Sequence, residues 1–216
     1  MTISSRSNTA DFALFIAAMA LVVAASNVLV QHPLHVWGLE DHLTWGAFSY
    51  PFAFFVTDLS NRRFGPALTR RLVYAGFFVG LVLSVVLASP RIAIASGSAF
   101  LAGQLLDVGL FQTLRARAWW VAPLASSLAG SALDTLLFFS IAFHCGDVPL
   151  LGGTVEAWLG LAGIPGACEP LPWQSLALAD FGIKMLIALA TLLPYRLIVS
   201  TWAEPAGRKR PVSGQT

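Results

Sequence analysis

The segment Trp120–Phe143 reads WVAPLASSLAGSALDTLLFFSIAF, and Asp134 is its only charged residue. A run of about 20 mostly apolar residues is the length that an α-helix needs to cross the hydrocarbon core of a bilayer. Similar runs recur along the chain, separated by proline, glycine or charged residues. The sequence therefore predicts a protein with several membrane-spanning helices.

The composition of the whole chain supports this prediction. Of its 216 residues, 56% are hydrophobic and 11% are charged, whereas about 25% of the residues of an ordinary soluble domain are charged. The net charge is only +2, and its basic residues are too dispersed to neutralise many phosphates. We predict an all-α polytopic membrane protein of about six transmembrane helices, with no nucleic-acid partner and no cofactor.

The apolar runs and their punctuation define the expected spans. These are Phe12–Val30, Trp45–Leu59, Leu72–Ala88, Ile92–Leu114, Trp120–Phe143 and Ser175–Val199. We expect a cytoplasmic tail at 1–11, a six-helix transport domain at 12–200 and a basic cytoplasmic tail at 201–216. An alternative interpretation of the first span is a cleaved signal sequence, because Val23 and Ala25 precede Ser26 in a small-residue pattern.

Basic residues collect in alternate connections between the spans. Short cytoplasmic loops are enriched in lysine and arginine, so these connections belong on the cytoplasmic side. The basic residues concerned are Arg6, Arg62, Arg63, Arg70, Arg71, Arg115, Arg117, Arg196, Arg208, Lys209 and Arg210. The opposite connections are 31–44 and 144–173, which contain neither lysine nor arginine, and the short turn 89–91, which contains Arg91. We predict an inner-membrane protein with both termini in the cytoplasm.

Two features of the outer loops bear on metal and disulfide chemistry. Cys145 and Cys168 both fall in the last outer loop, where an oxidising compartment permits a disulfide, and two unrelated thiols are the alternative. His32, His35 and His42 occupy the first outer loop. Without a clear further ligand, interfacial hydrogen bonding is a better explanation of these histidines than metal binding. We therefore predict no metal site.

Charged residues inside the spans need a reason, because each costs several kcal/mol unless it is paired or hydrated. Asp58 and Arg62 are four residues apart, as are Asp180 and Lys184. Each pair lies on one helix face and can neutralise itself. A structural ion pair and a coupling role that responds to substrate or a proton are both open interpretations.

Asp107 and Asp134 have no basic neighbour within one helical turn. Each therefore requires a partner from another helix, from water or from a substrate. Gln104 precedes Asp107 by three residues, and Ser131 precedes Asp134 by the same spacing, which gives two similar polar faces. These aspartates are functional candidates, and interhelical hydrogen bonding is the alternative.

Polar and aromatic side chains together suit a planar heterocyclic ligand. A guanine-like edge offers adjacent donors that one carboxylate can accept, while aromatic rings stack on its face. Stacking candidates are Phe48, Tyr50, Phe52, Phe54 and Phe55, although aromatic residues of membrane helices more often face lipid or the core. The proposed substrate-binding residues are Asn27, Gln31, Ser49, Phe52, Asp58, Gln104, Asp107, Asp134 and Lys184, with Arg62 and Asp180 in structural or coupling roles.

Short sequence words along nearly the whole chain carry a resemblance to a known family. They are Ser26-Asn27 with Leu29-Val30-Gln31, the run from Thr44 to Phe52, Thr57-Asp58-Leu59, Arg62 with Phe64-Gly65, Ala67-Leu68 with Arg70-Arg71, the run from Gly103 to Val108, Trp119-Trp120 with Ala122-Pro123, Asp134-Thr135, Phe138-Phe139 with Ile141-Ala142-Phe143, Asp180 with Lys184, and Pro194. In this order and spacing, the chain resembles the queuosine precursor transporters of the YhhQ type.

This resemblance implies a six-helix fold similar to the substrate-binding components of energy-coupling-factor vitamin transporters. It also implies uptake of 7-deazaguanine bases such as 7-cyano-7-deazaguanine or its aminomethyl relative, with either a separate energising module or none. The alternatives are a component for another vitamin or nucleobase, a purely structural membrane protein and an intramembrane enzyme. No serine and histidine pair of the protease type is visible, because every histidine lies in or beside an outer loop, so we predict no catalytic residues and no enzyme.

Overall fold

The computed structural model describes residues 3–34, 44–143 and 173–202. Over these residues the chain is α-helical apart from turns and an isolated bridge between Pro33 and Thr44. The helices are α1 (Ile3–Leu29), α2 (Gly46–Ser49), α3 (Phe52–Phe64), α4 (Pro66–Leu87), α5 (Pro90–Leu114), α6 (Val121–Phe143) and α8 (Trp173–Trp202). The predicted disulfide cysteines, Cys145 and Cys168, and the C-terminal tail lie outside the described residues.

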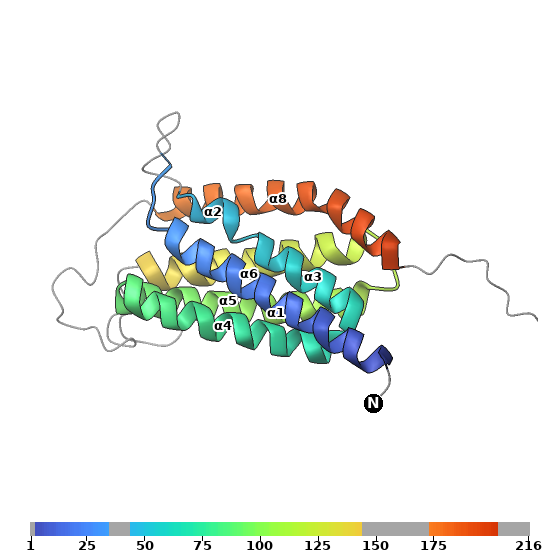
Figure 1. The fold of residues 1–216 in the computed structure, drawn as a ribbon. Helices are drawn as coiled ribbons and strands as arrows, with labels where there is room; N and C mark the ends of the chain where they lie inside the picture. The colour runs from blue at the N-terminus through green and yellow to red at the C-terminus, as the bar shows by residue number, and fades with distance from the viewer. Residues whose placement is uncertain (1–2, 35–43, 144–172, 203–216) are drawn as a thin grey trace, which may run out of the picture.

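Five of the described helices are long and apolar enough to cross a membrane. They are α1 from Thr9 onward, α4, α5, α6 and α8. The chain is thus an all-α polytopic membrane protein, which confirms the predicted class. Successive segments run in alternating directions, and the start of α1 and the end of α8 lie at the same end of the bundle (Figure 1).

The second expected span is only partly correct. The helical segment begins near Trp45 as predicted, but it is divided into α2 and α3, and it continues past Leu59 to Phe64. Pro51 lies at the division because its ring nitrogen has no hydrogen to donate to the preceding turn. In the extension beyond Leu59, the polar residues Ser60 and Asn61 are fully buried, and their side chains bond to Thr69 of α4 and to the Val108 carbonyl of α5.

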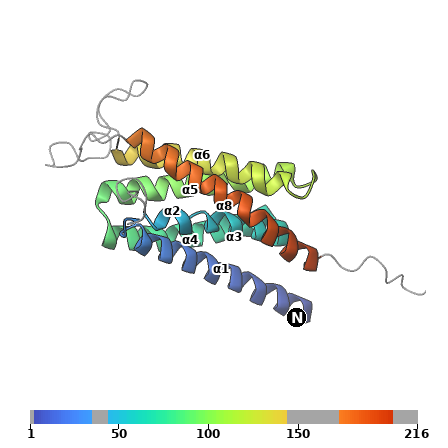
Figure 2. The ribbon, with the colours of Figure 1, turned by 90° about the horizontal axis from the view of Figure 1, so that it is seen from above.

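The α3 segment occupies the centre of the bundle. It contacts α1, α4, α5, α6 and α8, whereas α6 packs mainly on α5 and α8 (Figure 2). A tight turn leads from α3 into α4, where Gly65 has φ = 81° and Pro66 begins the next helix. Glycine suits this left-handed backbone, and proline suits a first helical position, so the sequence determines this turn locally.

At one end of the bundle, arginine and tryptophan side chains from several elements lie together. The Arg63 guanidinium contacts the Asp11 carboxylate at 2.9 Å and lies 5.3 Å from the ring centre of Trp202. Arg196 lies 5.0 Å from the ring centre of Trp119. We call this the basic end. It unites the start of α1, the end of α3, the α5–α6 connection and the end of α8.

Candidate functional site

A cavity of about 520 Å³ lies at the end of the bundle opposite the basic end. Its size falls within the range of about 300–1,000 Å³ that is typical of small-molecule sites. The end of α1, the α4–α5 turn, the end of α6 and the start of α8 surround it. The lining residues are Ser26, Asn27, Val30, Gln31, Thr44, Gly46, Ala47, Tyr50, Ser84, Leu87, Ala88, Ser89, Ile92, Ser96, Ala99, Asp134, Phe138, Phe139, Phe143, Leu176, Asp180 and Lys184.

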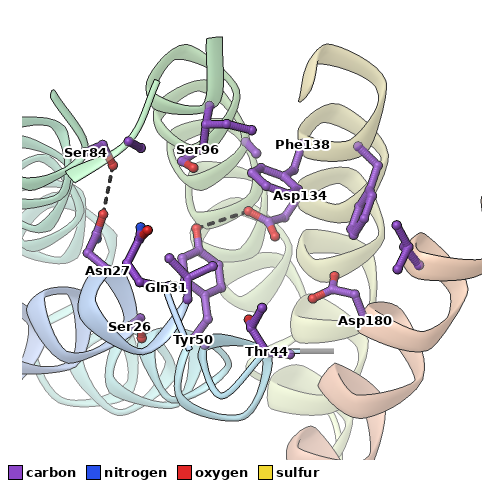
Figure 3. Close-up of a pocket in the computed structure, with 18 of the residues that line it drawn as sticks. Ser26, Asn27, Gln31, Thr44, Tyr50, Ser84, Ser96, Asp134, Phe138 and Asp180 are labelled. Atoms are coloured by element: carbon purple, nitrogen blue, oxygen red, sulfur yellow. Dashed lines mark hydrogen bonds between the residues drawn. The ribbon is translucent and has the colours of Figure 1, made fainter. Parts of the chain in front are cut away.

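Uncharged polar groups form one wall of the cavity. The Asn27 side-chain oxygen accepts a hydrogen bond from the Ser84 hydroxyl at 2.8 Å, and its amide nitrogen donates to the Val23 carbonyl at 2.9 Å. Gln31, in the turn that follows the end of α1, lies beside the same space (Figure 3). Two interactions therefore hold Asn27 in place, and this wall presents amide and hydroxyl groups to a ligand.

An ion cluster of Asp134, Asp180 and Lys184 forms the opposite wall. The Lys184 ammonium contacts the Asp134 carboxylate at 2.7 Å and the Asp180 carboxylate at 2.6 Å. It also donates to the Thr135 hydroxyl at 2.9 Å, and that hydroxyl donates to Asp180 at 2.8 Å. Two carboxylates and one ammonium leave a formal charge of −1, and each charge has a direct partner.

The ion cluster is shielded from solvent and extended by an aromatic hydroxyl. The side chains of Lys184 and Asp134 are each only 4% exposed. The Tyr50 hydroxyl donates to the second Asp134 oxygen at 3.2 Å, and the Tyr50 ring lies 5.6 Å from the Lys184 nitrogen (Figure 3). Buried charges are stable only when they are paired and hydrogen-bonded, so these four side chains hold one another in defined positions.

Aromatic side chains of α6 complete the lining. Phe138, Phe139 and Phe143 all border the cavity, and the Phe139 and Phe143 rings are 5.7 Å apart at their centres. Flat apolar rings next to charged and amide groups create a site for a planar ligand with polar edges. The cavity therefore combines a stacking surface with hydrogen-bonding walls.

The structure separates the predicted site residues into two groups. Asn27, Gln31, Asp134, Lys184 and Asp180 line the cavity. The expected Asp180–Lys184 ion pair is present, and the partner that Asp134 needed from another helix is Lys184.

The remaining predicted site residues lie away from the cavity lining. The Ser49 hydroxyl contacts the hydroxyl of the lining residue Ser26 at 2.9 Å. Phe52 is 43% exposed at the first residue of α3. Gln104 and Asp107 are fully buried between helices and do not border the cavity.

Asp58 is also buried outside the cavity, and its expected ion pair with Arg62 does not form. The two Asp58 oxygens accept hydrogen bonds from Ser126 at 3.2 Å and Ser127 at 3.1 Å. Arg62 instead donates to the Arg115 carbonyl at 3.0 Å. The i,i+4 spacing permitted the pair, but interhelical partners satisfy both groups separately.

Sequence reasoning missed most of the aromatic and serine lining. Phe138, Phe139 and Ser96 were not singled out as site residues, and Tyr50 was named only as a stacking candidate. One signal was available, because Phe138 follows Asp134 by four residues and thus shares its helix face. Leu176, Asp180 and Lys184 show the same spacing on α8.

These features define a class of protein, namely a multi-pass helical membrane protein with an internal polar and aromatic cavity. The model of the putative vitamin uptake transporter family matches residues 44–89 and 83–199. The chain belongs to this family. It is therefore a transporter and not an enzyme. No solved structure matches it, so the similarity to energy-coupling-factor components stays a prediction.

Relatives with curated names agree with this assignment. The queuosine precursor transporter of Escherichia coli strain K12 is 39% identical, over 81% of this chain and 79% of the relative. The probable queuosine precursor transporter of Haemophilus influenzae is 31% identical, over 80% and 79%. A Bacillus subtilis protein of the same name is 27% identical, over 58% and 66%.

Proposed function

We propose that this protein imports a queuosine precursor across the inner membrane. The expected substrates are 7-deazaguanine bases, either 7-cyano-7-deazaguanine or 7-aminomethyl-7-deazaguanine. The names of the relatives support this substrate class. The observation that carries the proposal is the cavity in which the Asp134–Lys184 ion pair lies beside an amide wall and aromatic rings.

The ion cluster suits the hydrogen-bonding edge of a guanine-type base. That edge has ring N–H and amino donors beside a carbonyl acceptor. A carboxylate of Asp134 or Asp180 accepts from the N–H groups, and the neighbouring Lys184 ammonium donates to the carbonyl. Because the donor and acceptor side chains are already held together, little ordering is needed when the base binds.

The flat faces and the outer edge of the base have partners elsewhere in the cavity. Phe138 and Phe139 supply stacking surfaces, and Asn27 and Gln31 supply amide groups for polar ring substituents. In the aminomethyl precursor, the protonated arm is a cation that Asp180 can meet. This arrangement supports binding of both precursors, with the same ring contacts and a different contact at the substituent.

The charge distribution supports import rather than export. Under the positive-inside rule, the basic end faces the cytoplasm. The cavity at the opposite end then faces the outside, where it can collect substrate. We therefore propose that both termini are cytoplasmic and that the described conformation is the one that captures the precursor.

Direct binding tests this proposal. The protein is purified in detergent, and calorimetry measures the affinity for both precursors, with guanine and an unrelated vitamin as controls. We expect selective binding of a precursor and a loss of about tenfold or more in Asp134→Asn, because a hydrogen bond to a charged group contributes about 1.5–3 kcal/mol.

Asp11→Asn is the matched control, because it makes the same substitution at the basic end of α1, far from the cavity. It should leave the affinity unchanged. Absence of binding to either precursor by folded protein would refute the substrate class. Equal affinity of Asp134→Asn and the wild type would remove Asp134 from the recognition site.

A further inference from the structure

A second acidic group lies deeper in the bundle, between the cavity and the basic end. We call Asp58 of α3 and Asp107 of α5 the buried carboxylate pair. Asp58 is 3% exposed and Asp107 is fully buried. Both lie against the same stretch of α6, because Ser126 donates to Asp58 at 3.2 Å, and a methyl group on Gly130, one turn later, would lie 3.2 Å from the Asp107 Cβ. Neither borders either of the described cavities, so direct substrate contact does not explain them.

Among the residues that the structure describes, neither side-chain oxygen of Asp107 has a partner within hydrogen-bond geometry. Two fully buried neighbours are also incompletely satisfied, namely the Asn61 side-chain oxygen and the Gln104 side-chain nitrogen. Asn61 donates to the carbonyl of Val108, the residue after Asp107, at 2.9 Å. Gln104 lies one turn before Asp107, and its oxygen accepts from Thr57 at 2.6 Å. The unpartnered groups thus come together around Asp107.

No cation pairs with these two carboxylates among the described residues. On α3, Arg62 is bound to the Arg115 carbonyl, and Arg115 in turn donates to the Arg62 carbonyl at 3.2 Å. On α8, the Tyr195 phenol is the titratable group near Asp58. On α6, the charged residue is Asp134, which is paired with Lys184 in the ion cluster.

On α6, the hydroxyl groups of Ser126 and Ser127 donate hydrogen bonds to Asp58, and both groups are neutral. The contact from α4 is also neutral. It is a hydrogen bond between the hydroxyl groups of Thr69 and Ser60 of α3, at 3.0 Å. Hydroxyl groups can solvate one carboxylate but cannot neutralise two. Two adjacent buried carboxylates without a cation are costly to ionise together.

We propose that Asp58 and Asp107 form a proton-binding site that holds one exchangeable proton between α3 and α5. A proton fits better than a metal cation, because a cation such as Ca²⁺ needs at least six oxygen ligands and space for itself, and neither described cavity extends to this pair. Binding converts one carboxylate to a carboxylic acid, and release returns the proton to water. Asp58 keeps its two serine donors as the ionised partner, and Asp107 carries the proton.

The helix crossing above this pair provides a physical link to the cavity. At the crossing of α5 and α6, a methyl group on Gly103 would lie 2.8 Å from the Gly130 carbonyl and 2.9 Å from the Asp134 Cβ. A methyl group on Gly130 would lie 3.2 Å from the Asp107 Cβ. The same close crossing therefore contacts both acidic groups, so a change in charge at Asp107 acts on the backbone that carries Asp134.

Infrared spectroscopy of the wild-type protein tests the proton site without any substrate. We expect a carboxylic-acid C=O absorption that persists at neutral pH, where ordinary aspartates are ionised. Asp107→Asn should lose this absorption, and Asp11→Asn should retain it. The loss in Asp107→Asn is expected because the remaining Asp58 carboxylate has two serine donors and ionises. Asp58→Asn is the second variant, and it should keep the absorption at a shifted frequency, because it leaves the buried Asp107 carboxyl group in place beside a neutral amide. An unchanged absorption in Asp107→Asn, or none in the wild type, would overturn the proposal.

Uptake into proteoliposomes tests the coupling, which rests on the proposed function. With 7-cyano-7-deazaguanine as probe, an inward gradient of about one pH unit should raise accumulation in the wild type by up to about tenfold, since one pH unit is a tenfold proton ratio. Asp107→Asn should equilibrate the probe without accumulation. Equal accumulation with and without the gradient would refute the coupling. Infrared absorption without probe binding would refute the substrate class alone, and binding without the absorption would refute the proton site alone.

Discussion

The ion cluster at the cavity and the buried carboxylate pair have the same number of carboxylates but different means of compensating their charge. Lys184 contacts both Asp134 and Asp180 within 2.7 Å. Within the described part of the chain, the side-chain donors to Asp58 are two serines, and Asp107 has no hydrogen-bond partner. A fixed ammonium keeps the first cluster ionised, whereas the second can be neutralised by a proton. This difference is the basis on which we propose recognition at the cavity and a change of charge at the buried pair.

Removing the cation from the cavity should produce the largest effect. Lys184→Met leaves Asp134 and Asp180 without their ammonium, and breaking a buried ion pair on one side costs about 3–5 kcal/mol. We expect a clearly lower thermal unfolding temperature in detergent and loss of precursor binding. Fluorescence-monitored unfolding and calorimetry measure the two quantities.

The matched comparison is Asp107→Asn in the buried carboxylate pair. It replaces the protonated Asp107 carboxyl group by a neutral amide of similar size, so its unfolding temperature should equal or exceed that of the wild type. If Lys184→Met and Asp107→Asn were destabilised equally, the contrast between a compensated and an uncompensated cluster would be wrong.

Adding a side chain at the crossing of α5 and α6, between the two acidic groups, should have an intermediate effect. In Gly103→Ala, the new methyl group meets the Gly130 carbonyl and the Asp134 Cβ at less than 3.0 Å, so α5 and α6 must separate. Overpacking of this kind costs about 1–3 kcal/mol. We expect lower thermal stability, weaker precursor binding and a shifted carboxylic-acid absorption in the same variant.

Gly109→Ala is the control for this prediction, because it makes the same substitution on α5 where nothing lies within 4 Å of the added methyl group. Its stability should be unchanged or slightly higher, since alanine favours a helix more than glycine does. A Gly103→Ala variant that behaved like Gly109→Ala would show that the crossing does not link the two groups.

The fold was largely predictable because bilayer thickness imposes a minimum length on each apolar run. The long helices α1, α4, α5, α6 and α8 all match expected spans. The second span was misjudged at its end because the run from Ser60 to Arg63 is polar. Its buried part is stabilised by interhelical hydrogen bonds, such as that from Asn61 to the Val108 carbonyl, which no local pattern encodes.

The candidate site was predictable only where its residues share one helix face. The spacing of Asp180 and Lys184 predicted their ion pair, and that pair is present. Asp107 and Asp134 looked equivalent, since each lacks a local cation and follows a polar residue by three positions. Their different surroundings depend on how α5 and α6 are rotated and packed, and this tertiary information cannot be read from the spacing within either helix.

The smallest effect is expected from the hydroxyl that extends the ion cluster. Tyr50→Phe removes the donor that lies 3.2 Å from Asp134 but keeps the aromatic ring beside Lys184 and Phe100. A hydrogen bond contributes about 0.5–1.5 kcal/mol, so precursor affinity should fall about two- to tenfold. Tyr74→Phe on the exposed face of α4 is the control and should bind like the wild type. If Tyr50→Phe impaired binding as severely as Lys184→Met, the hydroxyl and not the ammonium would determine the position of Asp134. The cavity would then depend on neutral hydrogen bonds, as the buried carboxylate pair does.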